Sequence, residues 1–280
     1  MKRKKFLGML CGVTAVASAA LFSMGAGFAN NQNRSETTFG PSMLRGGHFI
    51  QEFTVHTHWH TQEIDRHIVS LSGANPIGMP NNGANYTCGI IAGSNIIKGY
   101  NKIFPGLIPG FNSVATVLGR PGWANGMSPT FRNFQSDLAI AMGGNPQGVT
   151  LNQYFNGINT MVQNRGRTFH NQTMMNGNQL NLQNLKSQLR QNRYATVFMT
   201  GFNVASISGN PGVDRFDLRE YGGNHIMAVF GYRTITYRDA SGAIIRVKNF
   251  LEVVTGFGGT GLLYLNNHLT IYDLHMTFIS

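Results

Sequence analysis

The stretch His225-Ile226-Met227-Ala228-Val229-Phe230-Gly231-Tyr232 places a histidine at the head of an apolar run, directly after Gly222-Gly223-Asn224. The β-branched and aromatic residues that continue to Tyr237 are typical of a strand buried in a sheet. Because this histidine follows glycines and opens the strand, we expect its ring at a rim of the sheet. The alternative is a hydrogen-bonded histidine with a structural role.

The sequence on both sides of this strand predicts an α+β fold with one core. Runs of the same kind predict strands over 49–59, 194–202, 244–254, 262–265 and 269–279, with Asp239-Ala240-Ser241-Gly242 as a hairpin turn. Apolar spacing predicts helices over 88–103, 131–142, 151–162 and 182–193. Residues 71–85 and 104–126 are expected as irregular loops, and the mixed charges of 214–220 as a solvated loop. A set of helices followed by an antiparallel sheet is typical of an α+β domain.

The N-terminus has the pattern of a secretory signal peptide. Four basic residues at 2–5 precede an apolar stretch from Phe6 to Met24, and Gly27-Phe28-Ala29 offers small residues before a cleavage point. We therefore expect 1–29 to be removed, 30–47 to be a flexible lead-in and 48–280 to be the folded domain. Residues 48–79 are either a pro-segment or an accessory strand. The mature protein is expected to be secreted or associated with the cell envelope.

The cysteine count is informative because removal of 1–29 leaves only Cys88. A single thiol cannot form an internal disulfide, and in an exported protein it is exposed to oxidation. Cys88 lies at the predicted junction of a loop and a helix, where the helix dipole lowers the pKa of a thiol. A nucleophile is therefore favoured over a buried structural cysteine.

These two regions together resemble papain-like cysteine peptidases. Cys88-Gly89-Ile90-Ile91-Ala92 is similar to the nucleophile helix of the branch that includes bacteriocin-leader peptidases, and the stretch from His225 to Tyr232 is similar to its histidine strand. The separation of 137 positions (225 minus 88) lies in the papain range. The resemblance implies a nucleophile helix packed on a C-terminal antiparallel sheet, with Cys88 as nucleophile and His225 as base.

Two further site residues follow from the resemblance alone. Asn82 stands where the family has the glutamine of its oxyanion hole, with Asn81 and Asn85 as competitors. Thr255 stands where the family has the asparagine that orients the histidine, and its hydroxyl could accept from the imidazole. Four other side chains could take the place of Thr255: Glu252, Asn249, Asn266 and Asn267.

The resulting functional hypothesis is an exported cysteine peptidase that cleaves peptide or amide bonds through an acyl-enzyme, without a cofactor. One alternative is an inactive papain-like module that binds peptide or cell-wall polymer, and another is a peptidoglycan amidase or endopeptidase. Loss of residues 2–5 lowers the net charge from +11 to +7, which suits an anionic polymer, whereas the scattered cations do not favour nucleic acid. His56, His58 and His60 share one face of a predicted strand and could bind a metal, although a polar strand face is the favoured interpretation. No membrane span is expected in the mature chain.

Overall fold

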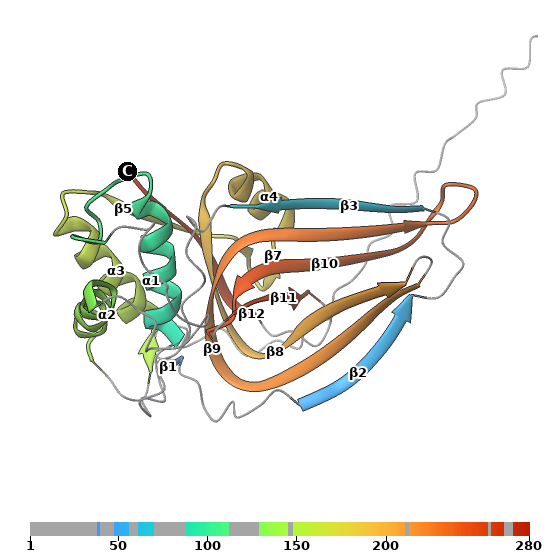
Figure 1. Ribbon diagram of the computed structural model, residues 1–280, viewed down its shortest axis with the longest axis horizontal. Helices are drawn as coiled ribbons and strands as arrows, with labels where there is room; N and C mark the ends of the chain where they lie inside the picture. The colour runs from blue at the N-terminus through green and yellow to red at the C-terminus, as the bar shows by residue number, and fades with distance from the viewer. Residues whose placement is uncertain are drawn as a thin grey trace, which may run out of the picture.

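The protein has an α+β architecture in which most of the helices gather at one end of a large antiparallel sheet (Figure 1). This computed structural model describes residues 38–39, 48–55, 61–69, 88–111, 129–144, 148–210, 213–256, 259–265 and 271–280. The α+β prediction is confirmed. The predicted signal peptide lies outside the described residues.

The described part of the chain contains four helices, and all four were predicted. They are α1 (Cys88–Asn101), α2 (Pro129–Ala141), α3 (Leu151–Gln163) and α4 (Leu182–Arg190). A capping box begins α3, because the Thr150 hydroxyl accepts from the backbone N–H of Gln153 and the Gln153 side chain accepts from the backbone N–H of Thr150. The side chain of Asn181 caps α4 in the same manner, by accepting from the backbone N–H of Asn184.

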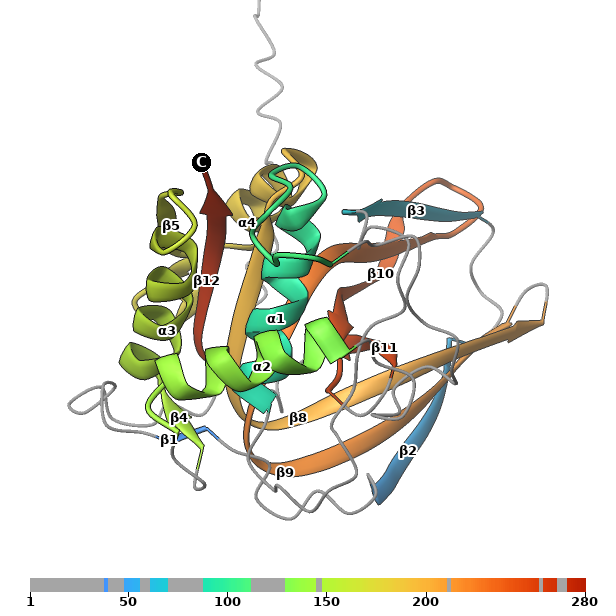
Figure 2. The same cartoon turned by 60° about the vertical axis from the view of Figure 1, so that its left-hand side comes forward.

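Helix α1 packs on β9 of the sheet and also contacts α2 and α3 (Figure 2). All of its residues except Ile90 are buried. Its glycines permit close contact: a Cβ on Gly99 would lie 2.5 Å from the Tyr194 ring. A helix that is buried on every face belongs to the core of the domain.

The sheet consists mainly of strands from the C-terminal half. The largest sheet contains β2 (His48–Val55), β3 (Thr61–Ile68), β5 (Phe169–Thr173), β8 (Tyr194–Asn210), β9 (Val213–Arg238), β10 (Ile244–Val254), β11 (Thr260–Tyr264) and β12 (Ile271–Ile279). Two small two-stranded sheets pair β1 (Thr38–Phe39) with β4 (Val149–Thr150), and β6 (Met175–Asn176) with β7 (Gln179–Leu180).

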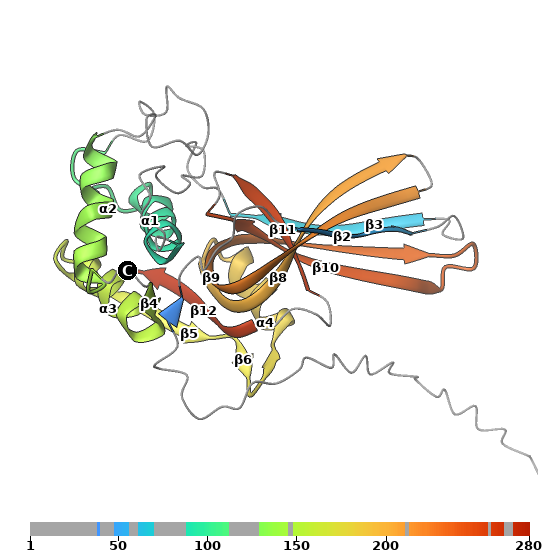
Figure 3. The same cartoon turned by 90° about the horizontal axis from the view of Figure 1, so that it is seen from below.

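Strand β9 bends in its middle so that its two halves run as separate arms towards the same end of the molecule (Figures 1 and 3). Strand β2 pairs with the first half, β10 and β3 pair with the second half, and β8 pairs with β9 from Val213 to Val229. Strand β11 pairs with both β10 and β8 and so closes a hydrogen-bonded circuit of β8, β9, β10 and β11. A second apolar cluster, separate from the main core, belongs to these four strands: Ala205, Phe216, Leu218, Ile235, Tyr237, Phe250, Leu262 and Tyr264.

The extent of β9 corrects one prediction. Residues 214–220, expected as a loop, are part of this strand. Phe216 and Leu218 are buried and lie two positions apart, so the apolar spacing of a strand was present among the charged residues. Strand β1 lies inside the predicted lead-in of 30–47, and β2 and β3 lie inside 48–79. No described helix is long and apolar enough to cross a membrane.

Ion pairs hold β3 at the edge of the sheet. Asp65 accepts from Tyr232 Oη (2.9 Å) and pairs with Arg190 (3.0 Å) and Lys186 (3.3 Å). The backbone fit is close, because a Cβ on Gly231 would lie 2.4 Å from the backbone carbonyl oxygen of His67. The attachment of β3 therefore depends on polar contacts and on a glycine rather than on apolar burial.

Gly231→Ala should displace β3 and lower the free energy of unfolding by about 1–3 kcal/mol, because a backbone atom must move to admit the methyl group. Urea unfolding measures this change, and limited proteolysis within 61–69 reports the release of β3. Gly259→Ala is the matched control, since a Cβ there meets nothing within 4 Å. Equal stability of the two variants would show that the close approach has no energetic consequence.

Candidate active site

Cys88 is the first residue of α1, as the sequence predicts. The first turn of the helix packs tightly: a Cβ on Gly89 would lie 2.6 Å from Val149 Cγ2, 3.3 Å from Ile226 Cδ1 and 3.5 Å from the Tyr154 ring. These contacts come from β4, β9 and α3. They place the thiol where the helical layer meets the sheet, and Cys88 itself is 0% exposed.

The sulfur of Cys88 contacts the strand that carries the predicted histidine. It accepts a hydrogen bond from the backbone N–H of Ile226, and the backbone N–H groups of Gly89 and of Cys88 itself also favour its charged form. Ile226 follows His225 directly. Two segments 137 positions apart (225 minus 88) are thus brought together by the docking of α1 on β9.

His225 lies next to an irregularity in the pairing of β9 with β8. Its partner across the sheet is Met199, and the register shifts between Thr200 and Phe202. Gly201 and Gly223, which flank the shift, have φ of +74° and +89°, in the left-handed region that favours glycine. Such bulges redirect side chains and are common beside active sites. Gly223, two positions before His225, therefore has a conformational role.

The imidazole of His225 is fixed between an aromatic ring and a glycine. Phe202 stacks on it with ring centroids 5.2 Å apart and an interplanar angle of 16°, and Tyr221 stacks on Phe202 at 5.0 Å and 8°. A Cβ added to Gly256, where φ is +82°, would lie 3.6 Å from Cε1 and Nε2 of the ring. His225 is 0% exposed, so its predicted place at a solvent-facing rim is wrong.

Thr255 contacts His225 through its main chain. His225 Nε2 lies 2.8 Å from the Thr255 carbonyl oxygen. Because a carbonyl can only accept, Nε2 carries the proton of the neutral ring, and Nδ1 is then the basic nitrogen. The Thr255 hydroxyl, expected to contact the ring, instead donates to the Gly259 carbonyl at 3.0 Å. The position was predicted, but the chemical group was not.

The other candidates for orienting His225 have different partners or lie outside the described residues. Glu252 Oε1 pairs with Arg66 (2.8 Å) and Arg233 (2.9 Å), and Asn249 Oδ1 accepts from the Thr234 hydroxyl (2.8 Å). The following candidates lie outside the described residues: Asn81, Asn82, Asn85, Asn266, Asn267, His56, His58 and His60. Within the described part, no three His, Cys, Asp or Glu residues gather in a way that could hold a metal.

Burial determines the protonation of both groups. Burial raises the pKa of the Cys88 thiol to about 12, although the backbone N–H groups around the sulfur act to lower it. The sequence predicts a lowered pKa for this thiol, so that prediction is wrong. Burial also lowers the pKa of His225 to about 4, although the bond to the Thr255 carbonyl acts in the opposite direction. At neutral pH the resting pair is therefore a neutral thiol and a neutral imidazole.

Sequence reasoning missed two residues that shape this site. Tyr154 is fully buried beside Cys88, and its hydroxyl lies 2.9 Å from the Thr196 hydroxyl. Its helical spacing indicated a core residue but not its neighbour. Phe202 was assigned to the end of a strand, and only the bulge places its ring on His225.

Thr255→Val should leave His225 in place, because the partner of the ring is a main-chain carbonyl. The loss of the hydroxyl bond to Gly259 should cost about 1 kcal/mol of unfolding free energy. Gly256→Val should instead displace the ring, since a side chain at φ +82° is strained and would contact the imidazole. The NMR shifts of the His225 ring nitrogens measure both effects, and a large change in Thr255→Val with none in Gly256→Val would contradict this arrangement.

The buried imidazole should make stability depend on pH. Its pKa in the folded state, about 4, lies below the ordinary value of 6.5, so the unfolded chain binds more protons in this range. The contribution of His225 is complete above about pH 6.5 and is lost as the pH falls towards 4. Urea unfolding at pH 7 and 4.5 should show a smaller loss of stability in His225→Gln than in the wild type.

His170→Gln is the control, because His170 lies at the Ser280 end of the sheet, away from this site. It should keep the pH dependence of the wild type. If His225→Gln loses as much stability as the wild type between the two pH values, the imidazole is not buried in its neutral form.

Comparisons with protein-family models, with curated proteins and with solved structures gave no match.

Proposed function

We propose that the chain is a papain-like cysteine hydrolase that cleaves peptide or amide bonds, with Cys88 as nucleophile and His225 as general base. The observation that carries this proposal is the hydrogen bond from the Ile226 N–H to the Cys88 sulfur. This bond places the Cys88 thiol beside Ile226, the residue that follows His225. Thiol acyl transfer needs a base within reach of the nucleophile, and the docking of α1 on β9 brings the segments that carry Cys88 and His225 together.

The hydrogen bonding of the imidazole supports its role as base. Nε2 donates to the Thr255 carbonyl, so the unprotonated Nδ1 is the atom that accepts the thiol proton. Stacking on Phe202 and the close approach of Gly256 limit rotation of the ring. Main-chain and aromatic contacts of this kind hold a base in a fixed orientation.

The reaction follows from these positions. The Cys88 sulfur attacks the carbonyl carbon while its proton passes to His225, and the negative charge moves to the carbonyl oxygen. The C–N bond then breaks, the amine leaves with the proton from His225, and water hydrolyses the thioester with His225 again as base. The backbone N–H of Cys88 and the Asn82 amide are the proposed oxyanion donors.

The burial of both groups adds a requirement for access. Cys88 and His225 are each 0% exposed, so a substrate reaches the sulfur only after a conformational change. Solvation of the opened site would lower the pKa of the thiol and raise that of the imidazole.

We further propose that the chain is exported, with peptides or proteins as substrates and anionic cell-wall polymer as a second partner. Peptidoglycan stem peptides would be cleaved by the same chemistry.

Replacement of either group should abolish hydrolysis. Cys88→Ala and His225→Ala should each reduce the cleavage of a fluorogenic peptide library by a factor on the order of 1000 or more, because no acyl-enzyme can form efficiently. Mass spectrometry of the wild type after acid quenching should show an acyl adduct on Cys88. His170→Ala should retain full activity. Equal cleavage by wild type and Cys88→Ala would refute the mechanism.

A binding module without activity is the second candidate, and the full burial of Cys88 with its raised pKa favours it. In that case the wild type and Cys88→Ser should bind purified cell wall with equal, salt-sensitive affinity and release no cleavage products. Co-sedimentation in 50 mM and 500 mM salt, with analysis of the soluble products, separates this function from hydrolysis.

A further inference from the structure

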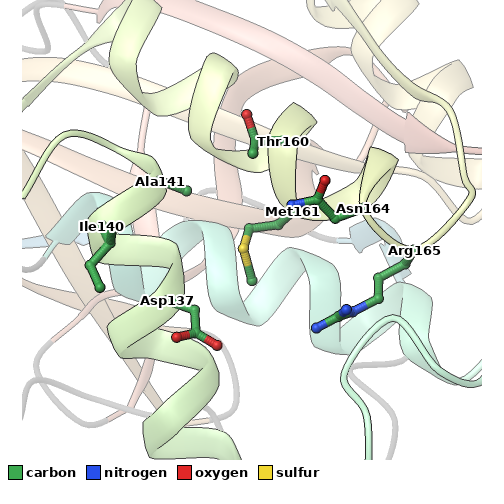
Figure 4. Close-up of a pocket in the computed structure, with 7 residues that line it drawn as sticks. All are labelled: Asp137, Ile140, Ala141, Thr160, Met161, Asn164 and Arg165. Carbon is green, nitrogen blue, oxygen red and sulfur yellow. The ribbon is translucent and has the colours of Figure 1, made fainter.

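A groove lies between the C-terminal turns of α2 and α3 and has a volume of about 340 Å³ (Figure 4). It is on the helical side of the molecule. Met161, which lines it, lies two turns along α3 from Tyr154, the residue beside Cys88. At 1.5 Å per residue the two positions are roughly 10 Å apart along the helix. Neither Cys88 nor His225 lines the groove. It is therefore a site separate from the candidate active site.

Close packing fixes the two walls of the groove. Met142, directly after α2, rests against Gly157 of α3, where a Cβ would lie 2.4 Å from Met142 Cγ and 3.0 Å from its backbone nitrogen. Two backbone hydrogen bonds stabilise the end of α2. The Met142 N–H donates to the Leu138 carbonyl, and the Gly144 N–H donates to the Ala139 carbonyl. The helices cannot separate easily, so the groove exists before any ligand binds.

The lining of the groove includes apolar side chains, and the core leaves one of them, Ile140, uncovered. Met161 and Ala141 line the groove, and Met161 is 8% exposed. Ile140 stands at its side with 74% of its surface exposed, the largest value for a large apolar residue in the described part of the chain. An exposed apolar side chain beside a preformed groove is typical of a binding surface.

Opposite charges face the groove from its two helices. In Figure 4 the Asp137 carboxylate approaches from α2 and the Arg165 guanidinium from the end of α3, with Met161 between them. Neither charge has an ion-pair partner within the described part of the chain. The Asn164 side chain adds a hydrogen-bonding amide beside the arginine.

We propose that this groove binds a short zwitterionic peptide with apolar side chains. Arg165 and Asn164 would hold the ligand's carboxylate, Asp137 its ammonium group, and the apolar side chains would cover Ile140 and Met161. The volume lies at the lower end of the range for small-ligand sites, which suits a dipeptide. An extended polyanion is disfavoured, because the single arginine is accompanied by an acid.

Isothermal titration of the Cys88→Ala protein with leucyl-leucine tests this proposal, and the substitution removes any turnover. We expect saturable binding that weakens by about three- to tenfold in Asp137→Asn and in Arg165→Gln. Ile140→Ser should weaken it also. Because all three residues are exposed, these variants should fold, and circular dichroism verifies that they do.

Derivatives of the dipeptide test the recognition of each end. The N-acetyl form should be insensitive to Asp137→Asn, and the C-terminal amide insensitive to Arg165→Gln. Absence of saturable binding, equal binding by the doubly capped dipeptide, or an affinity of all three variants equal to that of the Cys88→Ala protein would overturn the proposal. These results do not depend on whether the wild type is a hydrolase.

Discussion

The docking of the first turn of α1 against the middle of β9 is the constraint on which the site depends. Gly89 has no side chain, so Val149 reaches the helix at a distance that a Cβ would not allow, and Ile226 and Tyr154 pack directly beside it. The Cys88 sulfur can then accept the Ile226 N–H. The same contact joins the helical layer to the sheet, so that the core and the candidate site share one interface.

The shape of β9 determines what surrounds that interface. Its bend leaves His225 and Ile226 between two arms that are each stabilised by other strands, and β11 joins the arms by pairing with β10 and β8. The ion pairs of Asp65 and the missing side chain of Gly231 then fix β3 to the second arm. These contacts, which are distant from the site, hold the middle of β9 in place and so limit movement of the His225 imidazole.

The sequence predicted the helices and strands better than the contacts that the site residues make. Apolar periodicity identified all four described helices and the start of α1 at Cys88, because these signals are local. The first half of β9 was missed, since charged residues obscured the alternation of Phe216 and Leu218. Thr255 was placed correctly by its position, yet the contact uses its carbonyl, and no residue identity encodes a main-chain acceptor. The stacking of Phe202 depends on a shift in register that only the folded sheet specifies.

Burial and hydrogen bonding have opposite effects on the pKa of the Cys88 thiol. The helix start and three backbone N–H groups favour a thiolate, but complete desolvation outweighs them and raises the pKa to about 12. Oxidants and alkylating agents react with the thiolate, so a buried neutral thiol is protected from them. For a chain that we propose is exported and uses its single remaining cysteine as a nucleophile, this protection would preserve the thiol until the site opens. The hydrogen bonds that burial outweighs at rest would then favour the thiolate when water or substrate enters.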